Sequence, residues 1–198
     1  MYGVIAIGNM GPRATAFRLV CDYLSAEAGP EIIEKTIDVA SHGPGIWVEF
    51  TRVATDYLVG PALALKFEQL GLIGIVPALV ERHCHAVLRL NRTRNAQIRV
   101  EAIDLARELN EIDVTPLFMK GGAVLLSDLY EDFGARIIGD LDVVVPEERA
   151  TDCERKLLEL GYGRAPLEHE LRDKTIGVFL HEGRAAEVDL HREVIGPP

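Results

Sequence analysis

The segment Ile137-Ile-Gly-Asp-Leu-Asp-Val-Val-Val145 carries two carboxylates within a run that is otherwise typical of a buried β-strand. Side chains alternate between the two faces of a strand, so Asp140 and Asp142 project from the same face, roughly 6 to 7 Å apart at Cα. Two like charges side by side are costly unless a positive charge lies between them. Hard oxygen ligands at this spacing favour a divalent cation, Mg²⁺ or Mn²⁺. The alternative is that the strand ends at the solvent edge and binds nothing.

The residues on both sides of this strand predict a small α/β unit over residues 113–198. A short strand precedes it, and Pro116 favours the edge of a sheet or a bulge for that strand, because proline cannot donate to a β-ladder. Gly161 supplies the left-handed cap that ends the helix following it. The other expected elements are strands over 114–119, 175–180 and 185–194, helices over 123–130 and 147–160, and a tight turn over 181–184.

The preceding residues 1–112 have helical periodicity. Apolar residues recur at helical spacing over residues 13–25, 61–70, 77–94 and 96–112, and a further helix follows the breaker at 42–45. Trp47 and Phe50 lie on the apolar stripe of that helix and are predicted to be core residues. We therefore predict an α+β fold, with an all-helical N-terminal region over 1–112 and a mixed-sheet core over 113–198.

Two further segments add polar groups to the second half. Lys120-Gly-Gly122 stands between a strand and a helix, where backbone N–H groups attract phosphate oxygens and glycine permits close approach; a tight turn is the alternative. In the last strand, Glu187, Asp189 and His191 share one face. A third carboxylate beside the first pair would complete a site for two cations, whereas the alternative is a surface hairpin with a polar outer face.

Together these segments resemble the DNA polymerase β-like nucleotidyltransferase superfamily, and within it the branch of uncharacterised nucleotidyltransferases. The resemblance rests on Met119-Lys-Gly-Gly122, on Arg136 ahead of Asp-Leu-Asp, and on Val188-Asp-Leu-His191. It extends over about residues 75–195, and more loosely over the first 70 residues. Relatives carry an aromatic residue where this chain has Arg192, and they continue with further helices, so the chain is expected to be either a minimal member or truncated at its C-terminus.

The resemblance implies a role for each residue of these motifs. Asp140 and Asp142 hold the metal that accompanies a nucleoside triphosphate, and Asp189 joins them at a second metal and helps to activate an acceptor hydroxyl. Glu187 is the alternative third carboxylate, and His191 orients Asp189 or contacts the substrate. The residues implied in nucleotide binding are Lys120, Gly121, Gly122 and Arg136.

We therefore expect an enzyme, a nucleotidyltransferase that moves an NMP from an NTP to an acceptor hydroxyl with release of pyrophosphate. The acceptor is left open among a small molecule, a protein side chain and an RNA end. Two alternatives use the same residues: a non-catalytic module that binds a nucleotide or a protein partner, and a metal-dependent phosphoesterase. Release of pyrophosphate instead of inorganic phosphate distinguishes transfer from the phosphoesterase.

Composition narrows the remaining classes of protein. A net charge of −10 argues against non-specific binding to duplex DNA, which depends on Lys and Arg neutralising phosphates. No apolar run reaches the roughly 18–20 residues that span a bilayer, so no membrane partner is expected. Three scattered cysteines are expected as reduced thiols in a cytoplasmic protein. The basic run over residues 91–95 is interpreted as a solvated helix face, with the border of an active site as the alternative.

Overall fold

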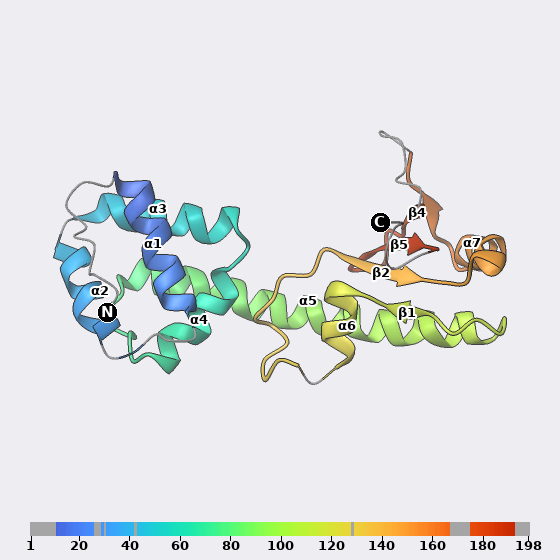
Figure 1. The fold of residues 1–198 in the computed structure, drawn as a ribbon, viewed down its shortest axis with the longest axis horizontal. Coiled ribbons are helices and arrows are strands. Elements are labelled where there is room, and N and C mark those ends of the chain that lie inside the picture. Colours follow the sequence, from blue (N-terminus) through green and yellow to red (C-terminus); the bar gives the residue numbers. More distant parts are fainter. Residues whose placement is uncertain are drawn as a thin grey trace, which may run out of the picture. The chain divides into compact units, whose positions relative to one another are not determined.

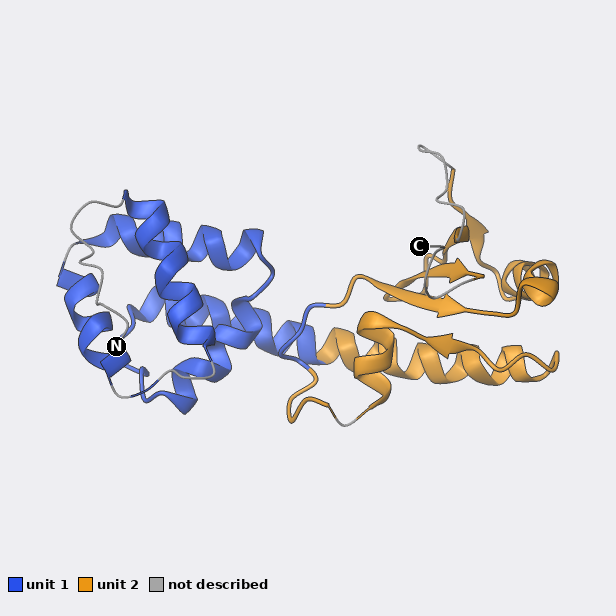
Figure 2. Ribbon diagram, in the orientation of Figure 1, with its two compact units in different colours: residues 1–92, 134–137 blue, residues 93–133, 138–198 orange. Residues whose placement is uncertain are grey.

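The computed structural model describes residues 11–25, 29, 31–41, 43–127, 129–166 and 175–192. The chain divides into two compact units (Figure 2): the first takes residues 1–92 and 134–137, and the second takes residues 93–133 and 138–198. Each unit has its own cluster of buried apolar side chains. Helices and a small mixed sheet are both present, which confirms the predicted α+β class.

The first unit is helical. It contains α1 (Pro12–Leu24), α2 (Glu31–Ser41), α3 (Pro44–Asp56), α4 (Gly60–Gln69) and the first part of α5 (Ala78–Asn110) (Figure 1). Proline occupies one of the first two positions of α1, α3 and α4, where its missing N–H removes no helical hydrogen bond. Trp47 and Phe50 of α3 are 5% and 0% exposed, which confirms their prediction as core residues. Helix α2 falls outside the helices predicted from the sequence.

Helix α5 belongs to both units and is a single helix of 33 residues. The sequence predicts two stretches, 77–94 and 96–112, and a division of the chain at residue 112. The compact units divide within α5 instead, between Arg92 and Thr93, because the later apolar residues of α5 belong to the core of the second unit. These residues are Ile98, Ala102, Leu105 and Leu109. Long as α5 is, no helix among the described residues has an apolar stretch that could cross a membrane.

The second unit combines the remainder of α5 with a mixed sheet in the order β1-β2-β5-β4-β3. Strands β2 and β5 are parallel, and the other neighbouring pairs are antiparallel. The strands are β1 (Leu117–Phe118), β2 (Asp140–Val144), β3 (Gly163–Arg164), β4 (Thr175–Leu180) and β5 (Glu187–His191), and the helices are α6 (Lys120–Leu126), the 3₁₀ turn η1 (Glu147–Arg149) and α7 (Ala150–Glu159).

The predicted elements of the second unit differ from the observed ones mainly at their ends. Strand β1 lies at the edge of the sheet, as Pro116 predicts, and Gly161 has a φ of +90° after α7, as its capping role requires. Strand β4 coincides with the strand predicted over 175–180, whereas β3 is not predicted. Helix α6 begins at Lys120, ahead of the predicted start at residue 123, so the glycine pair lies inside the helix.

Candidate metal centre

The parallel pairing of β2 and β5 brings acidic side chains from two distant parts of the chain to one region of the sheet. Asp142 is the register partner of Asp189, and Asp140 is the register partner of Glu187. His191 follows Asp189 by two residues and therefore projects from the same face of β5. The register of one strand pair thus determines which of the predicted carboxylates meet.

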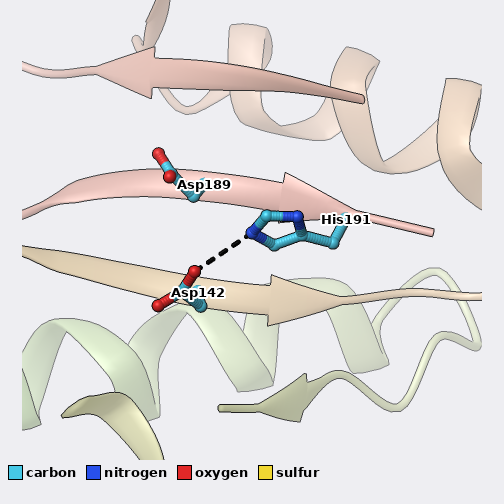
Figure 3. Close-up of side chains that lie close together, drawn as sticks. All are labelled: Asp142, Asp189 and His191. Atoms are coloured by element: carbon cyan, nitrogen blue, oxygen red, sulfur yellow. Dashed lines mark hydrogen bonds and ion pairs between the residues drawn. The ribbon is translucent and has the colours of Figure 1, made fainter. Parts of the chain in front are cut away.

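Asp142, Asp189 and His191 form the candidate metal centre (Figure 3). Each residue offers one ligand atom, and these atoms lie within 4.8 Å of one another. Within the described part of the chain, no other group of three or more His, Cys, Asp or Glu side chains meets this condition. The group lies wholly in the second unit.

Asp142 is the most enclosed member of the centre, because its side chain is only 1% exposed. Its Oδ1 accepts a hydrogen bond from Lys120 Nζ at 2.6 Å and lies 3.1 Å from His191 Nε2. Its Oδ2 is buried and, among the described residues, has no hydrogen-bond partner. A buried carboxylate oxygen without a donor is costly, and a divalent cation shared with Asp189 would satisfy it. The residues present therefore fit a divalent cation.

His191 is held through both of its ring nitrogens. Nε2 faces Asp142 Oδ1, and Nδ1 lies 3.4 Å from the hydroxyl of Thr175 on β4. Contacts at both nitrogens fix the orientation of an imidazole ring next to a metal site. The sequence predicts that His191 orients Asp189 or contacts substrate, and the structure places it against the other aspartate of the centre.

The negative charges of the three aspartates act on one another. Burial raises the pKa of Asp189 above its ordinary value, and the neighbouring Asp140 and Asp142 raise it further. The hydrogen bond to Asp142 raises the pKa of Lys120, and the charges of Asp140 and Asp189 add to this effect. Among the described residues Asp140 is not a member of the three-residue metal group, but its charge reaches Asp189.

Three of the four residues predicted to bind nucleotide, Lys120, Gly121 and Gly122, occupy the first turn of α6. Lys120 has a φ of +45° and an exposed side chain that ends on Asp142. Gly121 is buried, and a Cβ there would lie 2.8 Å from Ile138 Cγ2. A Cβ on Gly122 would lie 3.3 Å from atoms of both Leu141 and Phe118. Close packing against Ile138 therefore explains the glycine at position 121, and the fit at position 122 is tight.

The structure places two other predicted residues on the surface. Arg136 is exposed and belongs to the first unit, where its carbonyl oxygen accepts a hydrogen bond from Asn91 Nδ2 at 2.8 Å. Glu187 is exposed at the start of β5, opposite Asp140 in the register. Neither residue belongs to the three-residue metal group of the described chain.

Arg94 and Glu101 of α5 hold the backbone just before the two strands of the centre. Arg94 donates to the carbonyl oxygens of Ile138 and Gly139, which precede β2, and to that of Ala185 at 2.8 Å. Glu101 accepts hydrogen bonds from the backbone N–H groups of residues 185 and 186, at 2.8 and 3.3 Å, just before β5. These contacts position both metal-bearing strands against the same helix.

Sequence reasoning missed the positioning role of α5. Residues 91–95 are interpreted from the sequence as a solvated face, yet Asn91 and Asn95 are 6% and 0% exposed, and Asn95 Nδ2 donates to the carbonyl oxygen of Phe133 at 2.6 Å. One feature of the sequence could have indicated this role: Arg94 and Glu101 are seven residues apart, so they share one face of the helix. Their partners are loop carbonyl and N–H groups, which no side-chain pattern reveals.

Comparison with known proteins gives one finding on the family. The family model described as uncharacterised nucleotidyltransferase matches residues 44–198, which include the candidate metal centre and every residue implied in nucleotide binding. No curated protein and no solved structure matches the chain.

Proposed function

Because the chain belongs to the uncharacterised nucleotidyltransferase family, we propose that it is a metal-dependent enzyme that transfers an NMP from an NTP to an acceptor hydroxyl and releases pyrophosphate. The observation that carries the proposal is the meeting of Asp142, Asp189 and His191, with a buried Asp142 oxygen that lacks a partner among the described residues. Such a group suits nucleotidyl transfer, because this reaction depends on positioning phosphates and neutralising their charge.

Asp142 and Asp189 would hold the cation, Mg²⁺ or Mn²⁺, and Asp140 would add negative charge beside them. Carboxylate ligands suit Mg²⁺, and an imidazole beside them is compatible with Mn²⁺. His191 would keep the Asp142 carboxylate in place through Nε2 and leave Oδ2 for the cation. When bound, the cation supplies neutralisation of charge on the triphosphate and on the departing pyrophosphate.

The start of α6 is the proposed position of the triphosphate. Backbone N–H groups in the first turn of a helix lack intrahelical acceptors and attract phosphate oxygens. Gly121 and Gly122 would contribute these groups, with Lys120 as a cationic partner of the phosphates. Asp189 would assist the acceptor hydroxyl, because it is more exposed than Asp142.

The proposed acceptor belongs to one of three classes: a small molecule, a protein side chain or an RNA end. The net charge of −10 favours the first two, because an acidic protein repels a polyanion. The enzyme is proposed to act in the cytoplasm.

The test is incubation of the protein with each α-labelled NTP, Mg²⁺ or Mn²⁺, and a cell extract. Label on protein, RNA or a metabolite, together with pyrophosphate, supports the proposal and identifies the acceptor. Asp142→Asn should lower transfer by about 10²–10³-fold, the scale of losing one charge-stabilising group in an active site. Asp152→Asn is the matched control, because Asp152 pairs with Arg155 at 2.6 Å on α7, outside the metal group, and transfer should be unchanged.

Three outcomes would contradict the proposal. Undiminished transfer by Asp142→Asn would show that the metal centre takes no part in the reaction. Inorganic phosphate without label transfer would favour the phosphoesterase. If none of the four common NTPs raises the Tm in the presence of Mg²⁺, a partner-binding module is favoured, since ligands of the native state stabilise it by mass action.

A further inference from the structure

Lys120 is an ion-pair partner of the buried carboxylate in the candidate metal centre. Its Nζ lies 2.6 Å from Asp142 Oδ1, and its side chain is 64% exposed, whereas that of Asp142 is 1% exposed. The same oxygen lies 3.1 Å from His191 Nε2, which is charged only when the imidazole is protonated. Among the ion pairs of the described residues, Lys120 is therefore the partner of Asp142 that stays charged throughout the neutral pH range.

Comparison with another ion pair of the same unit, Arg155–Asp152, shows what is unusual about the Lys120–Asp142 pair. Arg155 Nη2 lies 2.6 Å from Asp152 Oδ1, and the Arg155 side chain is 65% exposed, so the distance and the exposure of the cation match those of Lys120. The carboxylates differ, because Asp152 is 37% exposed and Asp142 is 1% exposed. Water can replace Arg155 on an exposed carboxylate, whereas Asp142 needs another cation if Lys120 leaves.

We infer that Lys120 is an exchangeable counter-ion of Asp142, which neutralises this carboxylate until a divalent cation binds and then leaves it for the triphosphate. The inference rests on the proposed function and adds an exchange of partners to it. One carboxylate that holds both an ammonium group and a divalent cation brings like charges close together, and their repulsion weakens both contacts. The long, exposed Lys120 side chain has solvent around it in which to move, whereas Asp142 is enclosed on β2.

The exchange predicts effects of opposite sign on metal binding and on nucleotide transfer. Lys120→Met removes the competing cation, so the Kd for Mn²⁺ alone should fall by about tenfold. The same variant should lower the rate of transfer, because the triphosphate loses a cationic partner. If Lys120 contacted only phosphate, Mn²⁺ affinity would not change, and if it merely kept Asp142 in place, Mn²⁺ affinity would fall.

The experiment measures Mn²⁺ binding to the full chain without nucleotide, by calorimetry and by the electron paramagnetic resonance signal of free Mn²⁺. The wild type, Lys120→Met, Lys120→Arg and the matched control Arg155→Met are compared. We expect tighter binding in Lys120→Met alone, and a larger rise in Tm with Mn²⁺ in that variant than in the wild type. Equal or weaker Mn²⁺ binding by Lys120→Met would overturn the inference while leaving the metal centre intact.

A measurement on the wild type covers the case in which Lys120→Met does not fold. Acetylation of Lys120, followed by peptide mass spectrometry, should become faster when Mn²⁺ is added. The rate at Lys156, which pairs with Glu108 and Glu111, should not change. An unchanged rate at Lys120 at saturating Mn²⁺ would overturn the exchange, and absence of Mn²⁺ binding in every variant would overturn the proposed function together with it.

Discussion

The two compact units stabilise their interiors in different ways. In the first unit, Tyr23, Phe50 and Phe67 are fully buried and pack against one another with ring centroids 5.7, 5.8 and 6.3 Å apart. In the second unit the core is mainly aliphatic, and the sheet also carries Asp142, a carboxylate that is 1% exposed. The rings themselves are stabilised by packing, whereas a buried carboxylate needs donors or opposite charge. Both units therefore have an apolar core, and the second unit adds a buried carboxylate that depends on polar contacts.

The largest expected effect is a loss of stability in the first unit alone, caused by removing a packed side chain from its core. Phe50→Ala deletes a fully buried ring, and the free energy of unfolding of the first unit should fall by about 3–5 kcal/mol. Burial raises the pKa of the Cys84 thiol to about 12, so Cys84 should react with iodoacetamide only when the first unit opens. Burial also raises the pKa of Cys153 in the second unit.

These two thiols measure the opening of each unit by peptide mass spectrometry. Phe50→Ala should speed the labelling of Cys84 and leave that of Cys153 unchanged, while Mn²⁺ binding persists. Phe17→Ala is the matched control, because Phe17 is 43% exposed and its loss should have a much smaller effect. Equal acceleration at both cysteines would show that the two units unfold as one.

The next effect tests the polar contacts of the second unit. In Glu101→Gln, one of the N–H groups of residues 185 and 186 faces the NH₂ group of the new side chain, which cannot accept a hydrogen bond. The unfolding free energy should therefore fall by about 1–3 kcal/mol. Because these groups precede β5, Mn²⁺ affinity should fall as well. Glu108→Gln on the same helix, which loses only its ion pair with Lys156, should retain wild-type Mn²⁺ affinity. Urea unfolding measures the unfolding free energy, and calorimetry measures the Mn²⁺ affinity. Unchanged Mn²⁺ affinity in Glu101→Gln would show that α5 does not position the metal centre.

A smaller effect compares one glycine from each unit. Gly121→Ala places a Cβ 2.8 Å from Ile138 Cγ2, and the resulting overpacking should cost about 1–3 kcal/mol, partly offset by the better helix propensity of alanine. Gly45→Ala on α3 meets no atom within 4 Å and should be neutral or stabilising by up to about 1 kcal/mol. Urea unfolding measures both. A Gly121→Ala variant as stable as the wild type would refute the packing explanation for this glycine.

The smallest effect concerns a buried polar contact of the first unit. Tyr23 and Thr36 share a buried hydroxyl hydrogen bond of 2.8 Å, and Thr36 also donates to the carbonyl oxygen of Ile32. Tyr23→Phe should therefore lower stability by only about 1 kcal/mol, because the Thr36 hydroxyl keeps a partner. Urea unfolding monitored by circular dichroism tests this value. A loss as large as that of Phe50→Ala would mean that this hydrogen bond stabilises the first unit as much as the packing of a buried ring does.

Much of the fold follows from local pattern. Trp47 and Phe50 lie on an apolar helical stripe, and both are core residues. Strand β4 coincides with its prediction because its β-branched and aromatic residues stand between clear breaks in the pattern. The predicted start of α6 at residue 123 is too late, because α6 begins at Lys120 and includes both glycines despite their low helix propensity.

The sequence by itself determined the α+β class, the family resemblance, and the strand faces on which Asp140, Asp142 and Asp189 stand, because these depend on the order and spacing of nearby residues. Only the tertiary structure decided that Asp142 meets Asp189 and His191, that Lys120 reaches the same carboxylate, and that α5 holds the backbone before both strands. The physical reason is that the register between β2 and β5 joins residues far apart in the chain, and a slip of one residue would turn one set of side chains to the opposite face.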